Sequence, residues 1–159
     1  MKRQTTFLKA TLLVLALPVL GLSVIGFPML LMNITKNDWQ LAWVMYGIVA
    51  LLYGTAVAYF LALYQALKLL NYINHNVAFS SASVTALKKI KWNAFIITFL
   101  YVISMPLLYM IAEYDDAPGI IIIGVALGGA AFVVGVFATL LQHLLTSAID
   151  MKTENDLTV

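Results

Sequence analysis

Four long apolar stretches dominate the chain, and short polar segments separate them. The stretches cover residues 7–32, 41–70, 92–114 and 118–145. Because a helix needs about 20 apolar residues to cross the roughly 30 Å hydrocarbon core of a bilayer, each stretch is long enough to span a membrane. The pattern predicts an all-α polytopic membrane protein, with four transmembrane helices in a bundle that form a single integral membrane domain over residues 1–159.

The polar segments predict where the helices turn. Residues 71–91 form the predicted loop between the second and third spans, and residues 147–159 form the predicted tail. The helical pattern of the second span continues toward His75, so this helix is expected to project beyond the bilayer. A new helix is expected to begin near Ser81 or Ser83, because serine is a preferred helix cap.

Proline marks the first and third spans. The first stretch is about twice as long as the apolar core of a signal peptide, which favours a retained span over a cleaved signal. Pro18 and Pro28 lie within it and Pro106 lies within the third span. Each removes a backbone donor, so these positions predict kinks that neighbouring groups such as the Ser23 hydroxyl must compensate.

Small residues recur at every fourth position of the second span. They are Ala50, Gly54, Ala58, Ala62 and Ala66, and the fourth span repeats the form with Gly124 and Gly128. Small residues let helix backbones approach closely in a membrane, so these are predicted helix-packing positions. The partner is either another span of the same chain or a second molecule in a homo- or hetero-oligomer.

The geometry of this small-residue ladder limits its partners. A four-residue step rotates by about 40°, so the ladder turns through about 160° from its first member to its last. One straight helix cannot contact all of it. The ladder therefore predicts a central second span with at least two neighbours, around which the other three spans pack.

Composition and charge agree with this class and orient the chain. Hydrophobic residues make up 63% and charged residues 10%, against about 25% charged in soluble domains. Four spans place every basic residue except Lys36 on the side that holds both termini and the 71–91 loop. Because basic residues favour the cytoplasmic side, both termini are predicted to be cytoplasmic in a multi-pass protein of the cell membrane.

The residue types that carry catalysis or ion coupling are missing from the middle of the spans. No Asp, Glu, His, Lys or Arg lies there, whereas proton relays and ion-coupled transporters usually need one. The chain has no cysteine, no phosphate-binding loop and no metalloprotease or hydrolase motif. Neither His75 nor His143 has a second ligand at metal-binding spacing. The sequence predicts a protein that is not an enzyme and that uses no cofactor or metal.

A basic cluster marks the start of the third span. Lys88, Lys89 and Lys91 stand beside Trp92. This grouping is typical of contact with anionic lipid headgroups, and it would also anchor the orientation of the chain. The cluster is too short for a nucleic-acid surface, so no direct nucleic-acid partner is expected.

Hydroxyl groups also occupy the spans. The candidates are Thr55, Thr98, Tyr101, Ser104 and Thr139. They could line a narrow polar path or bond within the bundle, and bundle packing is the favoured interpretation.

Both ends and the middle loop carry residues that resemble a known family. The chain opens with Met1-Lys2-Arg3-x-Thr5-Thr6-x-Leu8-Lys9 and closes with Ala148-Ile149-Asp150-Met151-Lys152-Thr153-Glu154-Asn155-Asp156-Leu157-Thr158-Val159. With the segment 79–92, these residues make the whole chain resemble the bacterial domain-of-unknown-function 2975 family. The resemblance implies a small four-span integral membrane protein of bacteria that has no assigned activity. Members are often encoded beside a small helix-turn-helix regulator, which implies a regulatory partnership.

Two functions remain open at this point. The first is a non-catalytic interaction or regulatory protein whose 71–91 loop and tail contact a cytoplasmic partner, although a simple solvated tail fits the sequence equally well. The candidate partner-binding residues are Glu154, Asn155, Asp156, Leu157 and Val159. The second is a small channel or exporter for an uncharged or apolar solute, in which the hydroxyl groups would line the path.

Overall fold

A computed structural model describes the chain except for residues 1, 27, 30–31, 33–41, 115 and 158–159. The helices are α1 (Lys2–Gly21), the π-helical turn η1 (Leu22–Gly26), α3 (Ala42–Asn74), α4 (Ser81–Tyr114) and α5 (Gly119–Leu157). Four of the described helical segments are long and apolar enough to cross a membrane. The predicted class, an all-α protein with four transmembrane helices, is confirmed.

The turn between α3 and α4 is built from the polar residues that the sequence places there. Asn76 adopts a left-handed backbone conformation with φ of 59°. The amide of Val77 donates to the carbonyl of Tyr72 at 2.9 Å, which closes a common helix-ending motif. The Ser83 amide then donates to the Ser80 hydroxyl at 3.4 Å, so Ser80 caps α4. The predicted helix start near Ser81 is confirmed.

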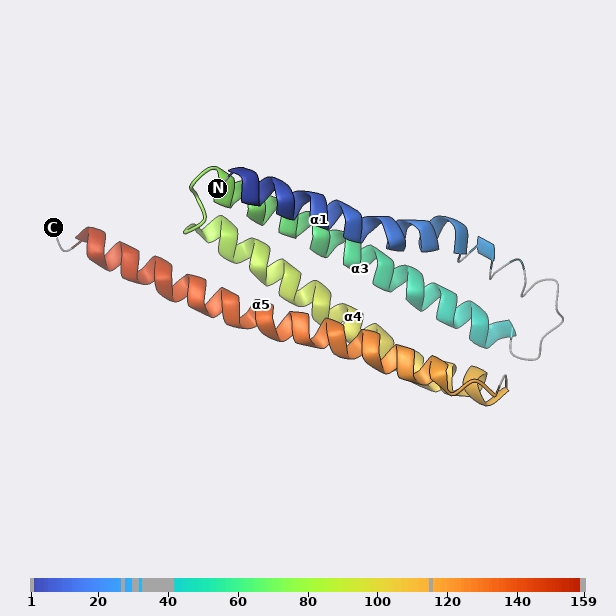
Figure 1. The fold of residues 1–159 in the computed structure, drawn as a ribbon. Helices are drawn as coiled ribbons and strands as arrows, with labels where there is room; N and C mark the ends of the chain where they lie inside the picture. Colours follow the sequence, from blue (N-terminus) through green and yellow to red (C-terminus); the bar gives the residue numbers. More distant parts are fainter. Residues whose placement is uncertain (1, 27, 30–31, 33–41, 115, 158–159) are drawn as a thin grey trace.

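The helices form a row in which each packs along the next. α3 contacts α1 on one side and α4 on the other, and α5 packs along α4 (Figure 1). The prediction that the fourth span packs around the second is therefore wrong, because the extensive contacts of α5 are with α4. The two inner helices of the row, α3 and α4, share the central position.

The α4–α5 contact is close because α5 presents almost no side chain to it. The buried residues of α5 are Gly124, Gly128, Gly135 and Ala138. A Cβ added at Gly135 would lie 2.6 Å from Cε1 of Phe95, and one at Gly124 would lie 2.8 Å from Cδ1 of Leu108. Steps of four, seven and three residues follow the heptad repeat of left-handed helix pairs. The two helices therefore run side by side over most of their length.

The α1–α3 contact has a different character. Two tyrosines of α3 donate hydrogen bonds to main-chain carbonyls of the first span, Tyr59 to Leu15 at 2.9 Å and Tyr53 to Ser23 at 3.0 Å. These carbonyls lie near Pro18 and the π-helical turn, where the regular helical bonding is broken. The Ser23 hydroxyl donates to the Val19 carbonyl at 2.8 Å. No residue in the most apolar window of this span is buried.

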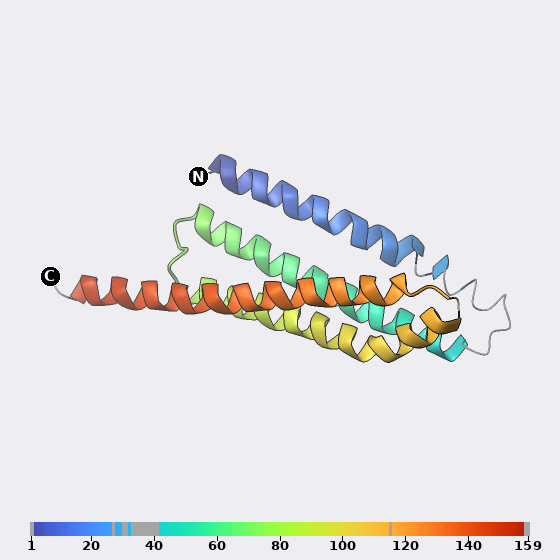
Figure 2. The same ribbon diagram turned by 60° about the horizontal axis from the view of Figure 1, so that its bottom comes forward.

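The fourth helix continues far beyond its predicted span. α5 has 39 residues, about 58 Å of helix against a hydrocarbon core of roughly 30 Å. The 147–157 part of the predicted tail is helical. Figures 1 and 2 show the end of α5 projecting past the other helices. Both termini lie at this end of the bundle, which we call the basic end, and the 116–118 turn lies at the opposite end, which we call the acidic end.

Candidate functional site

Contacts between neighbouring antiparallel helices show which residues lie at the same level of the bundle. Gly135 of α5 meets Phe95 of α4, and Gly54 of α3 meets Leu100 of α4. Counting along the helices from these contacts puts Lys88 level with about residue 142 and Lys68 level with about residue 86. The basic residues of α3 and α4 therefore lie in one plane across the bundle, which we call the basic plane.

The basic plane has the position expected of a membrane surface. Counting about 20 residues toward the acidic end reaches Tyr46 on α3, Tyr109 on α4 and Ile122 on α5. Glu113 and Asp116 lie just beyond. Tyrosine is enriched at membrane–water boundaries, and acids are excluded from the hydrocarbon. Many apolar side chains between the two levels are exposed, as expected of a surface that contacts lipid.

The predicted headgroup residues lie on this plane. Lys88, Lys89 and Trp92 are exposed and Lys91 is half-buried. The Lys91 Nζ lies 5.2 Å from the centre of the Trp92 ring, close enough for a cation–π contact. A second such pair, which the sequence analysis did not single out, joins Lys68 and Tyr64 of α3 at 5.0 Å.

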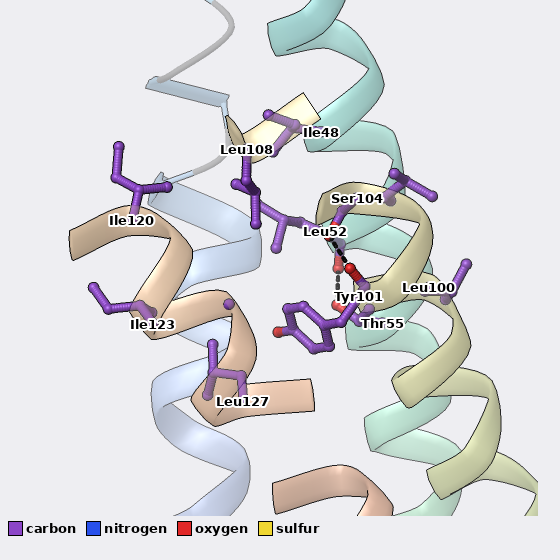
Figure 3. Close-up of a pocket in the computed structure, with 12 residues that line it drawn as sticks. Ile48, Leu52, Thr55, Leu100, Tyr101, Ser104, Leu108, Ile120, Ile123 and Leu127 are labelled. Carbon is purple, nitrogen blue, oxygen red and sulfur yellow. Dashed lines mark hydrogen bonds between the residues drawn. The ribbon is translucent and has the colours of Figure 1, made fainter. Parts of the chain in front are cut away.

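An apolar cavity of about 140 Å³ opens between α3, α4 and α5 in the acidic half of the bundle. The lining residues labelled in Figure 3 come from all three helices: Ile48, Leu52 and Thr55 from α3, Leu100, Tyr101, Ser104 and Leu108 from α4, and Ile120, Ile123 and Leu127 from α5. The splay of α3 from α5 creates this space, since both helices pack on α4.

The threonine and serine hydroxyl groups in and around this cavity each donate to a carbonyl of their own helix, and Thr98 also reaches the neighbouring helix α5. Thr55 donates to the Leu52 carbonyl at 2.7 Å, and Ser104 donates to the Tyr101 carbonyl at 2.7 Å (Figure 3). Thr98 donates to the Ala94 carbonyl at 3.0 Å and lies 3.4 Å from the Gly128 carbonyl of α5, and Thr139 donates to the Gly135 carbonyl at 2.8 Å. A side chain bonded in this way satisfies its donor without a solute or water.

A second apolar cavity, about 350 Å³, lies at the basic plane. Leu69 and Ile73 of α3, Leu87 of α4 and Phe79 of the turn form one part of its wall. The rest comes from α5: Leu141, Leu144, Leu145 and Ala148. Because residue 142 is level with the basic plane, the C-terminal part of this wall lies outside the hydrocarbon. The sequence does not indicate this cavity, because residues 141–148 fall at the end of the predicted fourth span and the start of the predicted tail.

The extension of α5 presents apolar side chains outside the bundle. Leu144 and Met151 are each 67% exposed and lie seven residues apart, on one face of the helix. The predicted partner-binding residues Glu154, Asn155, Asp156 and Leu157 are exposed on the last turns, and Val159 lies outside the described residues. The part of α5 that projects beyond the bundle is short, and a short helix without packing partners is marginally stable in water. Contact with another molecule would therefore stabilise the helical conformation of this part.

The small-residue ladder of α3 is divided by the structure. Ala58 is buried, Gly54 sits against the Leu100 side chain, and Ala62 and Ala66 are half-buried. Ala50 is exposed. On α5 the structure adds Gly135 and Ala138 to Gly124 and Gly128. Gly135 lies seven residues after Gly128, so a search for small residues at heptad spacing, rather than at four-residue steps, identifies it as a packing position.

The described part of the chain contains no cluster of three or more His, Cys, Asp or Glu that could hold a metal ion. Its architecture is that of a four-span helical membrane protein whose buried residues are mainly small or apolar, with a few polar side chains such as Gln65 among them.

Comparison with known proteins identifies its family. The chain belongs to the family described as "Protein of unknown function (DUF2975)", which matches residues 10–159. It is similar to the "Uncharacterized membrane protein YoaS" of Bacillus subtilis (strain 168), at 46% identity over 158 residues that cover 99% of each chain. No solved structure matches the chain. The family resemblance is confirmed, and neither description indicates catalysis.

Proposed function

We propose that this protein is a non-catalytic interaction protein of the bacterial cell membrane, with the basic end in the cytoplasm. The placement of the basic residues supports this orientation, because Lys and Arg favour the cytoplasmic side. Both termini and the 75–80 turn would then be cytoplasmic. The projecting end of α5 would be available to a cytoplasmic protein.

The observation that carries the proposal is the helical extension of α5 beside the apolar cavity at the basic plane. A helix with exposed Leu144 and Met151 next to an apolar cavity offers a hydrophobic anchor point outside the hydrocarbon. The partner that the family resemblance suggests is a small regulator of helix-turn-helix type. In this proposal the membrane protein holds that regulator at the membrane through α5.

Co-purification of the neighbouring regulator with the full-length protein tests the proposal. Deletion of residues 153–159, or Met151→Ser, is expected to lower recovery roughly tenfold, because loss of one apolar anchor typically costs more than 1 kcal/mol of binding free energy. Thr153→Ala is the matched control, since its exposed hydroxyl bonds only within the helix, to the Ile149 carbonyl. Equal recovery with every variant, or no recovery with the unaltered chain, would contradict the proposal.

The orientation has a separate test, because the chain contains no cysteine. Thr153→Cys and Asp116→Cys place one thiol at each end of the bundle, and both native side chains are exposed. A membrane-impermeant thiol reagent added to intact cells is expected to label position 116 alone. Labelling of position 153 alone would show that the protein has the opposite orientation, with the basic end outside the cell. The alternative function as a channel or exporter gains no support from Thr55, Ser104 and Thr139, whose hydroxyl groups donate within their own helices.

A further inference from the structure

The seam between α3 and α4 that holds Gly47 and Gly54 leads to two lysines. Gly47 and Gly54 of α3 meet Leu107 and Leu100 of α4, at one heptad spacing along each helix. Lys68 lies fourteen residues after Gly54, which places it within about 40° of the same face of α3 and at the level of Ala86 on α4. Lys89 lies eleven residues before Leu100, which places it within about 20° of the same face of α4. The two ammonium groups therefore flank one seam at the basic plane.

Aromatic side chains beside the two lysines favour a position of the ammonium groups at the membrane–water boundary. Lys68 lies over the ring of Tyr64, one turn nearer the membrane centre, at 5.0 Å. A cation–π contact of this kind holds the ammonium at the membrane boundary instead of letting it extend into water. The exposed Trp92, three residues after Lys89, supplies a second interfacial ring on α4.

No acidic residue of the chain balances these cations at their level. The stretches 2–16, 61–72, 82–95 and 135–149 bring all four helices to the basic plane, and none contains Asp or Glu. Uncompensated positive charge in a partly desolvated layer favours an anion. The surface on the membrane side of the lysines is apolar, with Leu61 50% exposed and Ile96 47% exposed.

We propose that the α3–α4 seam is a binding site for an anionic phospholipid. The phosphate lies between Lys68 and Lys89 at the basic plane, and an acyl chain follows the seam over Leu61 and Ile96. The two lysines favour an anionic headgroup because their charge is complementary to it. The apolar side chains of Leu61 and Ile96 on the membrane side of the lysines favour a lipid over a soluble phosphate. The site uses Lys68, which lies on a different span from the basic cluster at residues 88–91.

The test measures how phosphatidylglycerol raises the unfolding temperature of the full-length protein in a neutral detergent. Titration gives an apparent affinity, with phosphatidylcholine and inorganic phosphate as separate arms. Lys68→Gln and Lys89→Gln are each expected to weaken phosphatidylglycerol binding about fivefold, which corresponds to about 1 kcal/mol per surface lysine. Lys89→Arg keeps the charge and should retain binding. Lys152→Gln makes the same charge change beyond the basic plane and should leave binding unchanged.

The outcomes separate a built site from diffuse attraction. Loss of the phosphatidylglycerol effect in Lys68→Gln and Lys89→Gln, with the effect kept in Lys152→Gln, supports the site. An equal loss in Lys152→Gln, an unchanged affinity in Lys68→Gln, or an equal response to phosphatidylcholine overturns it. Equal stabilisation by inorganic phosphate at matched concentration would mean that Lys68 and Lys89 bind a soluble anion, and it would also overturn the lipid site.

Discussion

The two outer helices, α1 and α5, are attached to the bundle in different ways. α5 uses glycine and alanine at heptad positions, so its backbone lies close to α4 at four residues spread over about four helical turns. The first span has no buried residue in its most apolar window, and two tyrosines of α3 donate hydrogen bonds to it, one to Leu15 of α1 and one to Ser23 of η1. In a membrane, close packing holds helices together because hydrophobic burial cannot drive them out of lipid. The α4–α5 pair should therefore be the stable unit and α1 the weakly held one.

The largest effect is expected from filling the α4–α5 seam. Gly135→Leu places a side chain where a Cβ already lies 2.6 Å from the Phe95 ring, so the free energy of unfolding should fall by about 3 kcal/mol. Gly129→Leu is the matched control, because a Cβ there meets nothing within 4 Å. Equilibrium unfolding in mixed micelles measures both. Equal destabilisation by the two substitutions would mean that α5 does not use this face.

A smaller loss is expected where α3 carries its ladder of small residues. Ala58→Leu adds volume at a buried position, so it should lower the free energy of unfolding by about 2 kcal/mol. Ala50→Leu makes the same change two turns away at an exposed position and should stay within about 0.5 kcal/mol of the unaltered protein. Similar free energies of unfolding for the two variants in the same assay would mean that Ala58 is not packed against a neighbouring helix and that α3 does not lie at the centre of the row.

The tyrosine bonds to α1 should each contribute less. Tyr59→Phe removes the donor to the Leu15 carbonyl and should cost about 0.6 kcal/mol, the average for hydrogen bonds between membrane helices. Hydrogen exchange should accelerate in the amides of α1 and stay unchanged in those of α5. Tyr109→Phe, at an exposed ring on α4, is the control. If exchange in α1 is equally fast in both variants and the unaltered chain, the bond does not hold the helix.

The projecting end of α5 should contribute least to the bundle. Thr153→Pro removes the backbone donor at a position beyond the other helices and should reduce helical circular dichroism by a few residues. The free energy of unfolding should change by less than about 0.5 kcal/mol. A larger loss would show that residues 150–157 fold back onto the bundle or pair with a second copy.

Several features could be read from the amino-acid sequence because they depend on local chemistry. The ends of α3 and α4 follow from Asn76 and Ser80, which bond to the backbone within a few residues of their own position. The four spans follow from their length and apolarity, since only a helix satisfies its backbone within the hydrocarbon. The level of the lysines follows from the spacing of charge along each span.

The arrangement of neighbours required the tertiary structure. Lipid is as apolar as Leu or Ile, so hydrophobicity does not separate a side chain that faces lipid from one that faces protein. Ala50 and Ala58 belong to the same four-residue repeat of small residues, but Ala58 is buried and Ala50 is exposed. Equally, the donors Tyr53 and Tyr59 find carbonyls thirty and forty-four residues away. The sequence by itself determined four membrane helices and their charge levels, because these depend on each segment alone. Only the tertiary structure decided that α5 packs on α4, because that choice depends on how two surfaces fit.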